Sequence, residues 1–256
     1  MNNLIRWVIV LAALFMVGCC ATMLGHRSNP RLSLPEQLQR DTVALVMPDM
    51  ANKHVTPFCS GVWISKEHIL TAAHCVEDDS SKGPLGTLIP RPDSSVPGSL
   101  VFYTIYENVP NMGRPWTMKN NALSAMVVAY DKKHDLAVLI AVDPPKNHPW
   151  VWIDRGDIHV GDAVHTVGQI TGLWWTYHPG AVSAMRTLSG PHDHEIKMIQ
   201  VSSAAYKGGS GGGLFNESGH LIGLFSFISM RGPNQTFFVH RDVIIDFLKS
   251  ERIDFN

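Results

Sequence analysis

Residues 58–64 read FCSGVWI, and residues 69–75 read ILTAAHC. The first run includes residues 61–64, which predict a β-strand, and the second places His74 after small residues and directly before Cys75. If Cys75 ties this histidine to the neighbouring strand, its imidazole occupies a fixed place, which is what a general base requires. Taken alone, such a histidine is more often structural or exposed, because histidine is only intermediate in its preference for burial.

The protein has four cysteines, which are Cys19, Cys20, Cys59 and Cys75. The first two lie in an apolar N-terminal stretch, so that one pair remains in the rest of the chain. In an exported domain this pair predicts a disulfide, and closing a loop of this size stabilises a fold by roughly 3 kcal/mol. Two buried free thiols are the alternative. The chain has no CxxC motif and no Cys/His quartet at finger spacing, so we expect no structural zinc site.

An acidic residue stands directly before an apolar run at residues 134–140, which read HDLAVLI. A carboxylate at the mouth of a strand can accept the Nδ1 proton of a histidine and so select the tautomer that acts as a base. By itself Asp135 is more often a solvated strand end, because aspartate is mostly exposed in folded proteins. Other aspartates compete for the same role: Asp131, Asp143 and Asp157.

A glycine-dense stretch at residues 207–215 reads KGGSGGGLF. Glycine and serine runs often form flexible linkers, which is the simplest interpretation of this stretch taken alone. Its flanks argue against a linker, because residues 198–201 and 221–227 are both typical of strands. A glycine-rich loop between two core strands lets successive N–H groups point at one spot, so Ser210 would lie beside a ready oxyanion hole.

Short β-rich runs separated by turn residues occupy most of the chain, which indicates an all-β sandwich or barrel. One helix is expected over residues 241–252, where apolar side chains share one face. Two runs rich in turn residues, 78–97 and 108–121, predict surface excursions. The predicted strands are residues 43–47, 61–64, 100–106, 125–130, 136–141, 163–167, 196–201, 221–227 and 236–239.

The N-terminus has the pattern of an export signal. One basic residue precedes the apolar run at residues 7–17, so residues 1–18 predict a signal peptide or membrane anchor, and residues 19–40 a tether. The four residues that end at Cys19, MVGC, resemble a bacterial lipobox, which makes Cys19 the candidate for lipidation. A signal anchor and plain secretion are the alternatives. We therefore expect export to the cell envelope, facing the periplasm or exterior, and a membrane partner through this anchor.

Composition excludes several classes of protein. The chain of 256 residues is 45% hydrophobic and 17% charged, which is typical of a globular protein rather than a disordered or coiled-coil one. Lysine and arginine total 21 against 22 acidic residues, for a formal net charge of -1. The sequence has no long basic run to supply the positive charge that binding to a nucleic-acid backbone needs, so no nucleic-acid partner is expected.

Together the three stretches place His74, Asp135 and Ser210 in that order, with a cysteine pair around the histidine. This order is that of the chymotrypsin group of proteases. From about residue 41 to residue 247 the chain resembles the trypsin-like serine proteases of chymotrypsin fold. The resemblance implies two antiparallel Greek-key β-barrels with the active site between them, in a protease domain over residues 41–256 that divides near residues 145–155, plus a C-terminal helix.

Within that family the chain is similar to the bacterial HtrA-like branch, without a PDZ domain. Residues 161–164 (GDAV) and 180–183 (GAVS) resemble the pattern of the second barrel in that branch. Gly209 stands where relatives made as zymogens have an aspartate, so activation by a freshly cut N-terminus would have no partner. The resemblance therefore implies an active site that forms on folding.

The resemblance also implies roles for individual residues. His74, Asp135 and Ser210 would form the catalytic triad of a serine endopeptidase that cleaves protein or peptide substrates, with Asp135 favoured because the family's strand pattern follows it. The amides of Gly208 and Ser210 would form the oxyanion hole, and no cofactor or metal is implied. The primary pocket would be lined by Ala204, Ser226 and Ile228, which predicts cleavage after small or medium apolar residues.

Two other interpretations come from different classes. A protein-binding module can keep a protease fold without catalysis, because a fold does not determine a function. A metal site is the other, prompted by His192 and His194, which flank Asp193 in a loop near Gly190 and Pro191. Without a third obvious ligand, this loop is more often an exposed turn.

Overall fold

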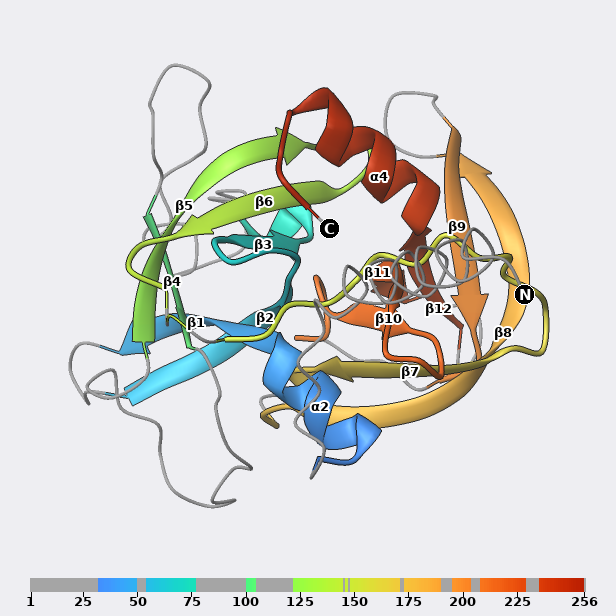
Figure 1. Ribbon diagram of the computed structural model, residues 1–256, viewed down its shortest axis with the longest axis horizontal. Coiled ribbons are helices and arrows are strands. Elements are labelled where there is room, and N and C mark those ends of the chain that lie inside the picture. The colour runs from blue at the N-terminus through green and yellow to red at the C-terminus, as the bar shows by residue number, and fades with distance from the viewer. Residues whose placement is uncertain are drawn as a thin grey trace, which may run out of the picture. The chain divides into compact units, whose positions relative to one another are not determined.

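Two closed β-barrels account for the strands that the described part of the chain contains (Figure 1). The computed structural model describes residues 32–49, 54–76, 100–104, 122–144, 146, 148–170, 173–189, 195–203, 208–228 and 235–255. All pairings between named strands are antiparallel, and each barrel follows the same winding order. The prediction of an all-β protein with two Greek-key barrels is confirmed.

The first barrel has the strand order β1-β2-β3-β6-β5-β4 and closes by pairing β1 with β4. Side chains alternate along β1, so that Val43 and Leu45 pack in one apolar cluster while Ala44 and Val46 pack in another. The strands are β1 (Thr42–Asp49), β2 (His54–Trp63), β3 (His68–Thr71), β4 (Leu100–Thr104), β5 (Ala122–Asp131) and β6 (Leu136–Ala141).

The second barrel has the order β10-β11-β12-β9-β8-β7 and closes by pairing β10 with β7. Its interior includes Val164, Ile199 and Phe238, all almost completely buried. The strands are β7 (Ala163–Gly168), β8 (Thr176–Ser189), β9 (Glu195–Val201), β10 (Gly213–Phe215), β11 (Leu221–Ile228) and β12 (Thr236–His240).

The C-terminal helix α4 (Arg241–Ser250) follows β12 directly, as predicted. The side chain of His240 accepts a hydrogen bond from the Asp242 N–H at the first turn, which satisfies one of the unpaired amides there. Ile244, Phe247 and Leu248 lie on one buried face, which packs into the larger apolar cluster. An amphipathic stripe of this kind stabilises a helix by burial rather than by intrinsic propensity.

The structure differs from the prediction for part of the tether. Residues 34–41 form helix α2 (Leu34–Asp41), which begins with a capping box between Ser33 and Glu36 and a proline in its first turn. Leu38 is 1% exposed and joins the larger core cluster. Leu34, one turn before it, packs against the same cluster, and the Gln39 side chain donates to the Trp175 carbonyl at 2.7 Å. The compact unit that contains both barrels spans Leu32–Asn256.

Several predicted features lie outside the described residues. They include the signal peptide, Cys19, the two surface excursions and the loop with His192 and His194. None of the helices that the structure describes is long and apolar enough to span a bilayer.

The connector between the barrels is hydrogen-bonded to both of them. The N–H of Val151 donates to the Trp63 carbonyl at 2.9 Å, which ties it to the first barrel. The N–H of Asp154 donates to the Leu221 carbonyl at 2.9 Å, and Ile153 forms an isolated bridge with Leu221, which ties it to the second. The predicted division near residues 145–155 therefore coincides with a bound segment.

Candidate active site

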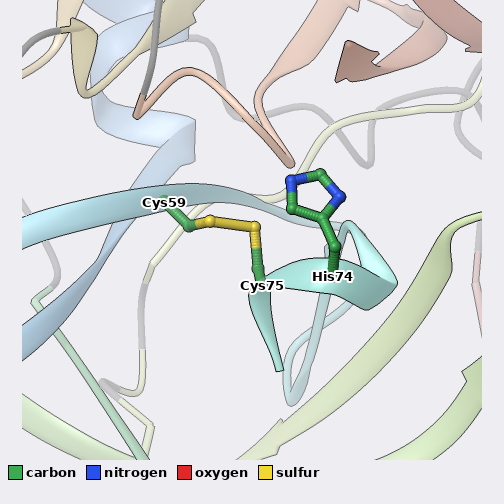
Figure 2. A group of neighbouring side chains, drawn as sticks. All are labelled: Cys59, His74 and Cys75. Carbon is green, nitrogen blue, oxygen red and sulfur yellow. A yellow bond between two sulfur atoms is a disulfide. The ribbon is translucent and has the colours of Figure 1, made fainter. Parts of the chain in front are cut away.

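His74 is held at the end of β3 by a disulfide (Figure 2). It is the middle residue of a 3₁₀-helix (Ala73–Cys75), and Cys75 is joined to Cys59 on β2 with a Cα–Cα distance of 6.1 Å. Both cysteines are buried, whereas the imidazole is 42% exposed on its side chain. The disulfide predicted from the cysteine count is present, and it anchors the backbone on one side of an accessible histidine.

In the described part of the chain, these three residues also form a cluster of potential metal ligands. One atom each from Cys59, His74 and Cys75 lie within 4.8 Å of one another. The two sulfurs are bonded to each other, so neither is a thiolate that could bind a metal ion. The arrangement therefore serves to place His74 (Figure 2).

Asp135 accepts three hydrogen-bond contacts from His74. The imidazole Nδ1 lies 2.9 Å from Oδ1 and 3.0 Å from Oδ2, and the backbone N–H of His74 donates to Oδ1 at 3.0 Å. Asp135 ends the turn between β5 and β6 with a φ of 58°, a left-handed conformation that aspartate tolerates better than most residues. With Nδ1 directed at the carboxylate, Nε2 is the ring nitrogen available to a reacting group.

The rival aspartates do not reach His74 by any hydrogen bond among the described residues. Asp131 instead organises the turn, because it accepts from the N–H groups of Lys133 and His134 and contacts His134 Nδ1 at 2.5 Å. Asp143 and Asp157 are exposed.

Ser226 contributes in a way that sequence reasoning missed. Its hydroxyl donates a short hydrogen bond to Oδ2 of Asp135, which reaches from β11 of the second barrel to the first. Its assignment to the primary pocket stays a prediction. Nothing local distinguishes this serine from the others in the chain, because the contact depends on how the two barrels pack.

Ser210 lies in a loop shaped by its glycines. Gly208 has a φ of 95° and Gly211 a φ of 79°, which residues with side chains rarely adopt. A Cβ on Gly211 would lie 2.2 Å from the Ser60 carbonyl oxygen and 2.4 Å from Thr71 Oγ1. The loop therefore packs its backbone directly against β2 and β3 of the first barrel.

The loop is fixed by main-chain hydrogen bonds from both barrels. The Ser60 N–H donates to the Ser210 carbonyl at 2.7 Å, and the Gly211 N–H donates to the Phe225 carbonyl at 2.9 Å. Cys75 Sγ lies 3.7 Å from the same Ser210 carbonyl. The glycine-rich stretch is thus an ordered loop at residues 208–212 and not a flexible linker, and it lies beside the disulfide that anchors His74.

The structure brings the predicted catalytic residues into one region without completing every contact. Among the described residues, no hydrogen bond joins His74 Nε2 to Ser210 Oγ. Such contacts often tighten only when a substrate binds. Of the predicted pocket, Ala204 and the side chain of Ile228 lie outside the described residues.

Comparison with known families decides the classification of the chain. The sequence profile described as "Trypsin-like peptidase domain" matches residues 59–224, which is more than half of the 256 residues. The chain belongs to the trypsin-like peptidase family. The match runs from the first disulfide cysteine to β11 and includes the histidine, aspartate and serine stretches.

Curated relatives of this trypsin-like peptidase are named "probable periplasmic serine endoprotease DegP-like". The protein of that name from Rhizobium meliloti is 35% identical over 153 residues, which are 56% of this chain and 30% of the relative. The one from Halomonas elongata is 36% identical over 136 residues, which are 52% and 28% of the two chains. The chain thus matches less than a third of the length of these relatives. The similarity to the HtrA-like branch is confirmed.

Solved structures share the fold. The Rv3671c protease of M. tuberculosis in its active form superimposes with a TM-score of 0.61 at 19% identity, covering 86% of this chain and 83% of that one. A serine endoprotease from Yersinia pestis gives 0.59 at 22% identity, covering 87% and 68%. The HtrA-type protease AlgW, solved with a tripeptide, gives 0.61 at 24% identity, covering 87% and 64%.

Burial shifts the pKa values of several histidines, including one on β7 and one on β8 of the second barrel. Burial lowers the pKa of His165 on β7 and that of His178 on β8 below the ordinary value of 6.5, because desolvation disfavours the charged imidazole. His165 Nδ1 lies 2.7 Å from the Tyr177 hydroxyl, whereas His178 Nε2 is buried without a hydrogen-bond partner in the described part of the trypsin-like peptidase. These side chains favour the neutral form in the folded state.

Proposed function

We propose that this trypsin-like peptidase is a serine endopeptidase with His74, Asp135 and Ser210 as its catalytic triad. The observation that carries the proposal is the pair of short contacts between His74 Nδ1 and the Asp135 carboxylate, at 2.9 and 3.0 Å. This pairing leaves Nε2 to act as a base beside the ordered Ser210 loop. The names of the DegP-like relatives support the same activity.

The proposed reaction is acyl transfer from a peptide to the enzyme and then to water. Ser210 Oγ attacks the scissile carbonyl carbon while His74 Nε2 takes the hydroxyl proton. The imidazolium is stabilised by Asp135 and returns the proton to the leaving amine, which departs. Water then repeats the sequence on the acyl-enzyme, with His74 again acting first as base and then as acid.

The tetrahedral oxyanion would be bound by the N–H groups of Gly208 and Ser210. No described residue accepts a hydrogen bond from either N–H, so both are available to a ligand. One donor of this kind contributes about 3–4 kcal/mol to stabilisation of the transition state. The backbone has a positive φ at position 208, which glycine adopts without strain.

The proposed substrates are proteins or peptides cleaved after small or medium apolar residues. Ala204, Ser226 and Ile228, the residues assigned to the primary pocket, bring no carboxylate to pair with lysine or arginine. We further propose that the chain acts after export, in the periplasm, as the names of the relatives suggest. Attachment to a membrane through the N-terminal segment, including lipidation at Cys19, belongs to the same proposal.

A fluorophosphonate probe tests the nucleophile, because it labels only a serine that a base has activated. The wild-type protein should be labelled, and Ser210→Ala and His74→Ala should both lose labelling. Ser218→Ala, which removes an exposed hydroxyl in the turn before β11, is the matched control and should be labelled like wild type. A folded wild-type protein that resists the probe would contradict the proposal and favour the non-catalytic binding module.

A further inference from the structure

Ser60 lies where the two barrels meet, and it is 0% exposed. It belongs to β2 of the first barrel, next to the disulfide residue Cys59. Its hydroxyl donates to the carbonyl of Gly208 at 3.0 Å, and its backbone N–H donates to the carbonyl of Ser210 at 2.7 Å. One buried residue thus binds the Ser210 loop at two points.

The two carbonyls belong to the residues whose N–H groups form the proposed oxyanion hole. A planar peptide unit joins the carbonyl of one residue to the N–H of the next, so the two held carbonyls fix the peptide planes on either side of the one that carries the Ser210 N–H. The Gly208 N–H is separated from its held carbonyl only by the φ and ψ of Gly208 itself. Gly208 has no side chain to restrict it and populates many backbone conformations at little cost. Among the described residues, the hydroxyl of Ser60 is the hydrogen-bond donor that holds the Gly208 carbonyl.

The hydrogen-bond pattern determines where the hydroxyl proton points. The backbone N–H of Gln169 donates to Ser60 Oγ at 3.0 Å, so this oxygen acts as an acceptor on that side. Its single proton is then directed to the Gly208 carbonyl. A side chain that donates and accepts at once through one atom is needed here, which a hydroxyl provides and a methyl group does not.

The space around the hydroxyl matches this role. A Cβ on Gly168 would lie 3.2 Å from Ser60 Oγ and 3.0 Å from the Cα of Gly209, so a side chain at this position would press on the hydroxyl and on the loop. The Ser60 carbonyl accepts a hydrogen bond from Thr71 Oγ1 at 2.7 Å, which orients the backbone of β2 itself. The carbonyl and the hydroxyl of Ser60 are therefore each oriented by another residue, Thr71 and Gln169, in addition to the contacts with the loop.

We infer that Ser60 is a positioning residue that keeps the N–H groups of Gly208 and Ser210 directed at the oxyanion. The inference rests on the proposed function. It assigns to a buried serine outside the triad the task of stabilising the transition state through the loop. Ser60 is buried, so this role acts through the loop.

The first test is the rate at which a fluorophosphonate labels Ser60→Ala. Removing one oxyanion donor lowers rates by about 10²–10³, and Ser60 acts indirectly, so we expect labelling to slow by about 10- to 100-fold per folded molecule. The matched control is Thr42→Val, which removes the buried hydrogen bond from Thr42 Oγ1 to the Leu38 carbonyl far along the chain from the loop. This variant should be labelled at the wild-type rate.

A second measurement separates positioning from a general loss of structure. A peptide boronate places a tetrahedral oxygen in the oxyanion hole, whereas the reduced-amide peptide of the same sequence has no carbonyl oxygen to place there. We expect Ser60→Ala to weaken binding of the boronate by about 10-fold or more and to leave binding of the reduced amide unchanged. The apparent pKa in the pH profile of labelling should also be unchanged, because His74 and Asp135 keep their contacts.

The outcomes distinguish the inference from the proposed function. If the wild-type protein is not labelled, the proposed function fails. If wild type is labelled and Ser60→Ala is labelled within about 3-fold of it, or if both peptides lose affinity equally, the proposed function stands and the positioning role of Ser60 is wrong. Should Ser60→Ala fold poorly, Ser60→Cys supplies a weaker donor of similar size, for which the role predicts a smaller slowing and a purely structural role none.

Discussion

The two halves of the candidate active site are held in place by different means. In the first barrel, His74 and Asp135 are positioned by side-chain hydrogen bonds and by the disulfide between Cys59 and Cys75. In the second barrel, the Ser210 loop is positioned by its backbone, through glycines and main-chain hydrogen bonds. A change of functional group should therefore disable the first half, whereas the mere addition of a Cβ should disable the second.

The largest effect is expected from a change of one atom in the first barrel. Asp135→Asn keeps the size of the side chain but no longer selects the tautomer of His74 with a free Nε2, so we expect kcat to fall by about 10⁴-fold at neutral pH. The rate of peptide hydrolysis measures the effect. Asp131→Asn, in the same turn, is the control and should stay within a few-fold of wild type. Equal losses in both variants would mean that the turn, and not the His74 contact, matters.

A methyl group in the second barrel should be the next most damaging change. Gly211→Ala combines a φ of 79° with contacts of 2.2 and 2.4 Å, so we expect the free energy of unfolding to fall by at least about 4 kcal/mol. Gly161→Ala provides the control, because Gly161 has a φ of 96° with no atom within 4 Å of its Cβ position.

That control isolates the backbone strain from the steric clash. Strain alone costs about 1–2 kcal/mol, which is the loss expected for Gly161→Ala. Urea denaturation of both variants measures the difference. Similar losses would show that the close packing of the loop against the first barrel contributes little.

Removal of the disulfide should weaken the first barrel by an intermediate amount. The bond closes a loop with a sequence separation of 16 between Cys59 and Cys75. We expect the double variant Cys59→Ala, Cys75→Ala to lose about 3 kcal/mol in the free energy of unfolding, because its unfolded chain is less restricted. A reducing agent should destabilise the wild-type protein by a similar amount and leave the double variant unaffected. A response of the double variant to the reductant would point to another target.

The smallest effect is expected from acid, and it should arise in both barrels, because burial also lowers the pKa of His68 on β3 and of His240 on β12. Because the pKa values of His165 and His178 are lowered from 6.5 by burial, the unfolded chain binds more protons than the folded one just below that pH. The contribution of these neutral histidines to the free energy of unfolding is therefore fully present above about pH 6.5 and declines as the pH falls further. We expect the unfolding temperature to be lower at pH 5 than at pH 7, and His178→Leu to reduce this difference.

The matched control for this substitution is His159→Leu, whose side chain is 72% exposed. It removes a histidine without removing a buried imidazole, so the acid sensitivity should persist. An unfolding temperature that does not change between pH 7 and pH 5 would contradict the prediction.

The candidate catalytic residues were easier to predict from the sequence than the strands around them. The stretches around His74, Asp135 and Ser210 need particular residue types in a particular order, and this order remains visible in one sequence. Strand β8 was missed because its 14 residues include Pro179 and Gly180 and show little apolar alternation. The signal lay in the GDAV and GAVS stretches, since Ala163 pairs with Ala181 and Val164 with Gly180 in the structure.

Other features escaped prediction because they depend on packing between distant segments. Strands β3 and β10 have only four and three residues, too few to show a period. The hydrogen bonds of Ser60 and Ser226 join residues 148 and 91 positions apart, and a lone serine in an apolar run carries no local mark of such a partner. Helix α2 falls within the predicted tether, because Leu38 is its only fully buried apolar side chain and leaves little pattern in the sequence.

The described part of the connector is bonded to both barrels and not only to one of them. Val151 bonds to Trp63 on one side and Asp154 to Leu221 on the other, and Ser60 bonds to the loop of Ser210 across the same boundary. Separating the halves would break these hydrogen bonds and expose buried backbone groups, which is unfavourable. We therefore expect the two barrels to unfold as a single cooperative unit. The second barrel alone would lose the hydrogen bond from Ser60 on β2 to the Ser210 carbonyl, so the loop of the nucleophile would not keep its geometry.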